Sequence, residues 1–67
     1  MSVAKVSEIS STSSKSFEDA VTQGLARASK TIRHIRSAWI KEQHVRCEEG
    51  KIVDYQVNMM VTFIIDD

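Results

Sequence analysis

The chain has 67 residues, with nine basic and nine acidic side chains and a single cysteine, Cys47. This length predicts a single domain over residues 1–67, and the balanced charge without a basic block argues against a nucleic-acid partner. One cysteine excludes an intrachain disulfide and fits a reducing, cytoplasmic location. No Cys/His cluster has zinc spacing, and no segment approaches the ~20 apolar residues that cross a bilayer. Because so small a core is only marginally stable, we expect the chain to self-associate.

The first half of the chain predicts a short strand followed by a helix. Residues 3–9 alternate apolar and polar side chains, and the Ser/Thr-rich segment after them predicts a loop. Ser16, with Asp19 three residues later, is typical of a helix N-cap. Apolar residues then recur at steps of four and three, which predicts one helical stripe: Val21, Leu25, Ala28, Ile32 and Ile35. Gly24 lies inside this helix, where glycine costs about 1 kcal/mol relative to alanine, and a close backbone contact would explain it.

The second half predicts two long strands joined by a turn. Residues 37–48 form one strand, the segment EEGK forms the turn, and residues 52–65 form the other strand. One alternating set of the last strand is apolar and predicts the face toward the helix: Val53, Tyr55, Val57, Met59, Val61, Phe63 and Ile65. The order strand, helix, strand, strand predicts an α+β fold in which a three-stranded antiparallel sheet wraps around one helix.

The register of the predicted hairpin decides which face carries Trp39, the one tryptophan. A two-residue loop at Glu49 and Gly50 pairs Trp39 with Met60, on the face away from the helix. The same register predicts two more pairs on that face: Lys41 with Asn58, and Gln43 with Gln56. A loop one residue longer or shorter would reverse the two faces. An aromatic ring beside amides on an uncovered sheet suits a subunit interface, which is the commoner case, or a planar heteroaromatic ligand.

The sequence resembles the dodecins over nearly its whole length. The resemblance rests on STS at residues 11–13, SFEDAV at the start of the helix, LARASKTIRHIR at its end, and VDYQVNMMVTF in the last strand. Dodecins are strand-helix-strand-strand proteins that form hollow dodecameric shells. Many bind riboflavin or FMN, and they are thought to store or quench the flavin rather than catalyse with it. The resemblance therefore implies a homododecamer with a flavin cofactor.

The resemblance also implies a set of cofactor-binding residues. The family's ring-binding glutamine falls on Gln56, and its stacking tryptophan, found in a WFEV-like stretch, falls on Ser37. This chain has SAWI there, so Trp39 lies two residues further on, on the same face but about 6–7 Å away. Arginines of some bacterial flavin-binding relatives fall on His44 and Ile64. We therefore expect Gln56, Trp39, Ser37 and His44 to form the cofactor-binding set, with Gln56 bonding the ring and Trp39 stacking on it.

Two other functions are alternatives to flavin storage. A branch resembling IRSAW lacks the stacking tryptophan, and a bound cation has been suggested for such relatives, so a flavin-free shell with a structural or cation-binding role is the alternative. An enzyme is not expected, because no nucleophile, base and orienting group can be assembled from the sequence. The acidic residues that would attract a cation lack the spacing of a calcium loop: Glu42, Glu48, Glu49, Asp54, Asp66 and Asp67.

Overall fold

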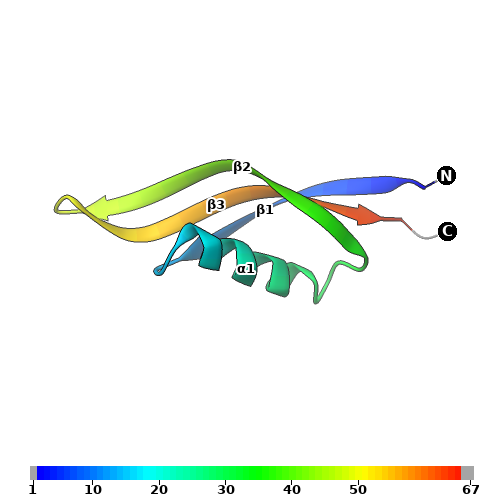
Figure 1. The fold of residues 1–67 in the computed structure, drawn as a ribbon, viewed down its shortest axis with the longest axis horizontal. Helices are drawn as coiled ribbons and strands as arrows, with labels where there is room; N and C mark the ends of the chain where they lie inside the picture. The colour runs from blue at the N-terminus through cyan, green and yellow to red at the C-terminus, as the bar shows by residue number, and fades with distance from the viewer. Residues whose placement is uncertain (1, 66–67) are drawn as a thin grey trace.

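The computed structural model describes residues 2–65, which form one helix and three strands. In chain order these are β1 (Ala4–Ser13), α1 (Phe17–Ala28), β2 (Ile35–Glu48) and β3 (Lys51–Ile64). The strands lie in the order β1-β3-β2, and both pairings are antiparallel, so β3 is central. The helix lies across one face of the sheet (Figure 1). The predicted α+β fold, with a three-stranded antiparallel sheet and one helix, is confirmed.

Strand β1 is longer than the sequence pattern predicts. The Ser/Thr-rich segment from Ser10 to Ser13 was expected to be a loop, but it continues the strand and pairs with residues 55–58 of β3. The prediction was wrong because serine and threonine favour turns only weakly, and the backbone hydrogen bonds of a neighbouring strand outweigh that preference. The connection to the helix is therefore confined to residues 14–16.

The helix begins as predicted and ends earlier than predicted. Ser16 is the N-cap, and its Oγ accepts a hydrogen bond of 2.9 Å from the backbone N–H of Asp19. The helix ends at Ala28, so the predicted extension of the apolar stripe to Ile32 and Ile35 is wrong. The N–H of Ile32 still donates to the Ala28 carbonyl at 2.8 Å. His34 then takes a φ of 61°, a conformation outside the right-handed helix, and the chain enters β2.

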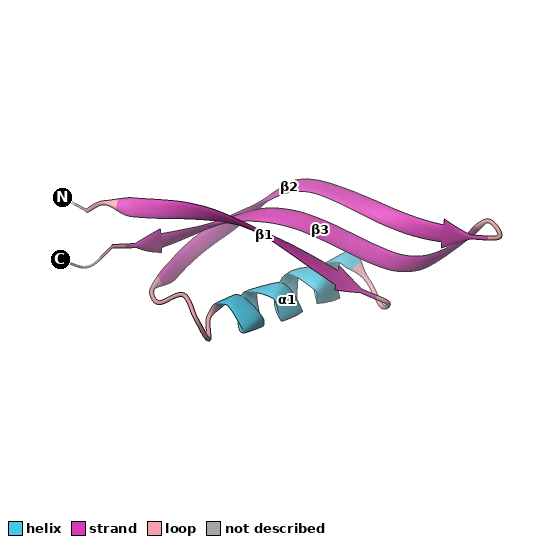
Figure 2. Ribbon diagram, turned by 180° about the vertical axis from the view of Figure 1, so that it is seen from behind, coloured by secondary structure: helices cyan, strands magenta, loops and turns pink. Residues whose placement is uncertain are grey.

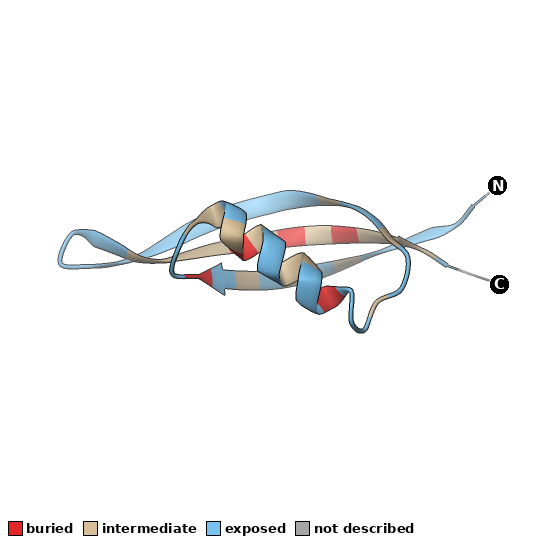
Figure 3. Cartoon of the chain, turned by 60° about the horizontal axis from the view of Figure 1, so that its bottom comes forward, coloured by how far each residue is buried: buried red, intermediate tan, exposed pale blue. Residues whose placement is uncertain are grey.

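The core lies between the helix and the middle of β3. Val57, Met59 and Val61 are fully buried there, and Ala20 of α1 is buried against them. These three strand residues belong to the predicted core face, so that face is confirmed at its centre. Figure 3 shows the buried segments of β3 lying beneath the helix, while the hairpin end of β2 and β3 is exposed.

The sheet is much longer than the helix that covers it. The described part of the chain measures 51 × 19 × 13 Å, and the β2–β3 hairpin projects beyond the helix (Figure 1). Helix α1 packs mainly on β1 and β3. The view from behind shows the helix on one face only (Figure 2). The opposite face, which we call the open face, therefore has no cover within one chain.

Candidate functional site

The β2–β3 turn sets the position of Trp39. Glu49 and Gly50 form a two-residue turn with φ values of 52° and 75°, the positive pair that fits the twist of a hairpin. Trp39 pairs with Met60, as predicted, and therefore lies on the open face. The Trp39 side chain is 51% exposed within the single chain. A large ring is thus held at a surface where another molecule can cover it.

In the middle of the hairpin the predicted register is wrong by one residue. The pairs differ as follows: Asn58 pairs with Glu42 rather than Lys41, and Gln56 pairs with His44 rather than Gln43. A β-bulge between Ile40 and Glu42 adds one residue to β2, and a second irregularity after Arg46 restores the expected register at the turn. Two compensating irregularities change the register only in the segment between them, so a register counted from the turn cannot reveal them. A third irregularity lies between Ile35 and Ser37, at the start of β2.

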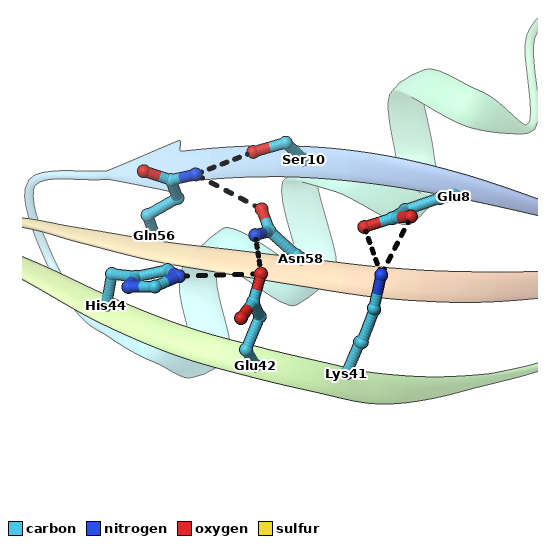
Figure 4. A network of polar contacts seen from close by, with 7 residues as sticks. All are labelled: Glu8, Ser10, Lys41, Glu42, His44, Gln56 and Asn58. Atoms are coloured by element: carbon cyan, nitrogen blue, oxygen red, sulfur yellow. Dashed lines mark hydrogen bonds and ion pairs between the residues drawn. The ribbon is translucent and has the colours of Figure 1, made fainter.

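The bulge changes which side chains lie on the open face. Gln43, expected on this face, instead pairs with Val57, which is buried on the helix side. Lys41 and Glu42, although consecutive, both take part in the polar contacts of the open face (Figure 4). The sequence pattern does not predict Glu42 on this face, because its position depends on the bulge.

A chain of hydrogen bonds crosses the open face from β2 to β1 (Figure 4). Asn58 Nδ2 donates to Glu42 Oε1 at 2.7 Å, and Gln56 Nε2 donates to Asn58 Oδ1 at 3.1 Å. Gln56 Nε2 also donates to Ser10 Oγ at 3.0 Å. His44 Nε2 lies 3.7 Å from the same Glu42 oxygen. The hydrogen bond from Asn58 is the main reason that the pKa of Glu42 lies below its ordinary value, and His44 acts in the same direction.

The two cations that lie among these polar residues are paired with carboxylates. Lys41 Nζ lies 3.2 Å from Glu8 Oε1, which joins β2 to β1 across the central strand. Arg46 donates to Asp54 Oδ2 at 2.7 and 2.9 Å and to Glu48 Oε2 at 2.6 Å. These carboxylates, Asp54 first and then Glu48, raise the pKa of Arg46 above its ordinary value. Neither cation is therefore available to an anionic ligand unless a carboxylate releases it.

Two of the predicted site residues, Gln56 and His44, line a depression of about 260 Å³ near the outer part of the hairpin. Its lining residues are Thr12, His44, Val45, Arg46, Asp54 and Gln56. Trp39 lies on the same face, but its partner Met60 is four residues from Gln56, which is about 13 Å along a strand. Ser37 pairs with Thr62 and lies further still. Within one chain the structure therefore brings Gln56 and His44 together, and leaves Trp39 and Ser37 apart from them.

Other kinds of site find little support in the described residues. No group of three or more His, Cys, Asp or Glu side chains within residues 2–65 is arranged to hold a metal ion. Asp66 and Asp67, considered above as cation-attracting residues, lie outside the described residues. Across the same 64-residue stretch, no helix is long and apolar enough to span a membrane.

Comparison with known proteins agrees with the fold and with the sequence resemblance. The family model Dodecin matches residues 3–66. The dodecin of Thermus thermophilus is 35% identical over 65 residues, with 97% of this chain and 94% of that protein covered. A crystal structure of a mutant of the T. thermophilus dodecin matches with a TM-score of 0.94 at 34% identity, over the full length of both chains.

A further structural relative carries a named ligand. The crystal structure of the calcium-chelating antigen calcium dodecin from Mycobacterium tuberculosis, with a novel calcium-binding site, matches with a TM-score of 0.82 at 35% identity. The match covers 97% of this chain and 93% of that one. Together with the family model and the T. thermophilus relative, it shows that the present chain belongs to the dodecin family, which consists of non-enzymatic binding proteins.

Proposed function

We propose that this chain binds and sequesters a flavin, riboflavin or FMN, on the open face of its sheet. The observation that carries the proposal is the position of Gln56. It occupies the place of the family's ring-binding glutamine, lies half-buried on the open face, and borders the depression shared with His44. A planar ring laid on this face would meet an amide at its edge and flat strand surface beneath it.

Stacking on Trp39 requires more than one copy of the chain. Trp39 and Gln56 are about 13 Å apart along the strands, so one ring cannot stack on the indole and bond that amide of the same chain. We therefore include assembly in the proposal: copies of the chain form a cytoplasmic homododecamer, in which the open face of one copy is covered by another. The uncovered apolar side chains of the open face support such burial: Trp39, which pairs with Met60, and Val6, which pairs with Thr62, are 51% and 43% exposed in one chain.

The direct test is a visible absorption and fluorescence spectrum of the purified protein before and after riboflavin and FMN are added. A bound and stacked flavin should lose most of its emission and comigrate with the protein in gel filtration. Flavin that stays bright and elutes separately would contradict the proposal.

Two variants with a matched control assign the site. Gln56→Ala should weaken flavin binding, whereas Gln43→Ala should not, because Gln43 lies on the other face of the same hairpin. Trp39→Ala should weaken binding and leave the assembly intact. A smaller species by light scattering would instead show that Trp39 serves as an interface anchor.

The alternative function is a flavin-free shell with a structural or cation-binding role. Two observations favour it: Ser37 stands where the family's stacking tryptophan is expected, and a calcium dodecin is among the structural relatives. Residues 2–65 of one chain hold no metal cluster, and in this alternative the cation binds between copies. Calorimetric titration of the flavin-free protein with Ca²⁺ distinguishes a cation-binding shell, which releases or absorbs heat on saturation, from a purely structural one.

A further inference from the structure

We propose that Glu42 is a specificity-determining positioning residue. Through Asn58 it fixes the side-chain amide of Gln56, so that the Gln56 carbonyl oxygen alone faces the ligand. The site then selects a planar ring that presents an N–H group at that point. This inference rests on the proposed flavin function and adds which edge of the ring is recognised and why.

The first step is the contact between Glu42 and Asn58. An ionised carboxylate only accepts hydrogen bonds. Asn58 Nδ2 donates to Glu42 Oε1 at 2.7 Å, and the reversed amide would place the Asn58 oxygen against the carboxylate instead. Lys41 does not compete as a donor, because its ammonium lies 3.2 Å from Glu8. Glu42 therefore holds Asn58 with its Oδ1 directed toward Gln56.

The second step passes this orientation to Gln56. Its Nε2 carries two hydrogens and has two acceptors, Asn58 Oδ1 at 3.1 Å and Ser10 Oγ at 3.0 Å. A reversed Gln56 amide would bring its oxygen against Asn58 Oδ1, which offers no hydrogen. Both N–H groups are thus used within the chain, and no group among residues 2–65 donates to Gln56 Oε1. The amide of Gln56 is left as an acceptor.

The consequence is a requirement on the ligand. A free carbonyl oxygen at a site that becomes covered by ligand needs a donor, because an unpaired buried acceptor is costly. The oxidised isoalloxazine ring has one N–H, at N3 of its imide edge. A ring methylated at N3 cannot supply this donor and adds bulk at the contact. The site should therefore distinguish two flavins that differ only at N3.

The test compares lumiflavin with N3-methyllumiflavin, titrated by fluorescence quenching into three proteins: the wild type, Glu42→Gln and Glu8→Gln. The wild type should bind lumiflavin about tenfold more tightly or better. Glu42→Gln should lose most of that preference. A glutamine at position 42 can donate as well as accept a hydrogen bond, so the side-chain amides of Asn58 and Gln56 can each adopt either of their two flipped orientations. Glu8→Gln is the matched control: it removes a carboxylate of the same face that bonds Lys41 rather than Asn58, and it should keep the preference.

Equal affinity of the wild type for the two flavins, or a preference that survives Glu42→Gln, would overturn the proposal. A second readout needs no flavin: the hydrogen-exchange rate of the Gln56 side-chain amide protons, measured by NMR on the ligand-free assembly. Exchange should become several-fold faster in Glu42→Gln and stay unchanged in Glu8→Gln. If neither flavin binds, the proposed function fails, and this exchange rate still decides the orienting role: equal rates in all three proteins would refute it.

Discussion

Gly24 lies so close to Ser11 that a Cβ atom at position 24 would lie 2.9 Å from the Cβ of Ser11. The same atom would lie 2.6 Å from Met59 Cε, but that methyl group ends a flexible side chain and can move. The Cβ of Ser11 is attached directly to the backbone of β1 and cannot. The glycine expected from the sequence to permit a close approach is therefore the point at which the helix rests on β1.

Gly24→Ala should destabilise the protein, although alanine favours a helix by about 1 kcal/mol over glycine. Forcing the helix away from β1 costs about 1–3 kcal/mol, as other overpacked cores do, so we expect a small net loss. The midpoint of guanidinium unfolding measures it. Thr22→Ala, at an exposed position of the same helix, is the control and should be neutral or slightly stabilising. A higher midpoint for Gly24→Ala would show that the helix can shift without cost.

Met59 and Met60 provide a test of the two faces with the same side chain. Met59 is fully buried under the helix, so Met59→Ala should cost about 2–5 kcal/mol of unfolding free energy. Met60 lies half-buried on the open face, so Met60→Ala should cost clearly less. Both variants are compared with the wild type by chemical denaturation at equal chain concentration, because assembly adds to the apparent stability. Equal losses would mean that the open face is as tightly packed as the core.

The strand pattern was the most informative part of the sequence, and the hairpin register was only partly recoverable from it. The alternation of β3 predicts its buried face, because side chains of a strand must alternate and only one set is apolar. The pairing of Trp39 with Met60 followed from the two-residue turn. The pairings of Glu42 with Asn58 and of His44 with Gln56 did not, because the two register shifts that produce them compensate each other and cannot be seen by counting from the turn.

The other incorrect predictions, of the end of β1 and the end of the helix, are explained by tertiary contacts. The serine-rich end of β1 is a strand because β3 provides hydrogen-bonding partners for its backbone. The intrinsic preferences of the serine residues contain no information about this neighbouring strand. The apolar stripe of the helix continues to Ile32 in the sequence, yet the helix stops at Ala28. The network on the open face depends on contacts between three strands, so it could be described only when all three were in place.

The stability of the protein should depend on the ionisation of Glu42 in the acid range. Its pKa is lowered in the folded chain, chiefly by the hydrogen bond from Asn58, with His44 contributing. The folded state therefore holds this proton less tightly than the unfolded state does. The stabilisation is complete above the unfolded pKa and is lost as pH falls through the folded pKa.

The stability difference between the wild type and Glu42→Gln should accordingly shrink as the pH is lowered through this acid range. Unfolding midpoints at a series of pH values measure the difference. Glu49→Gln is the control, since Glu49 is exposed in the turn and its side chain forms no hydrogen bond within residues 2–65. A difference that is independent of pH would show that Glu42 gains nothing from its neighbours.

The β2–β3 turn can be improved by substitution. Glu49 has a φ of 52°, which is unfavourable for a residue with a long side chain, whereas asparagine tolerates it and Asn-Gly is the preferred pair for such turns. Glu49→Asn should raise the unfolding free energy by up to roughly 1 kcal/mol. Glu48→Asn, one residue earlier and within β2, should bring no gain because asparagine is poor in strands. Thermal unfolding of the two variants decides between them.

The uneven regularity of the sheet has a mechanical consequence. The β1–β3 pairing continues without a break through all ten residues of β1, while the β2–β3 pairing is interrupted at three places. Bulges bend and twist the strand that carries them. Two of the three irregularities place the extra residue in β2 and the third places it in β3 near the turn, whereas β1 carries none. The helix packs mainly on β1 and β3 rather than on β2. In the proposed shell each identical copy must turn through the same angle, and the irregularities of β2 are the places in the sheet where bending would set that angle.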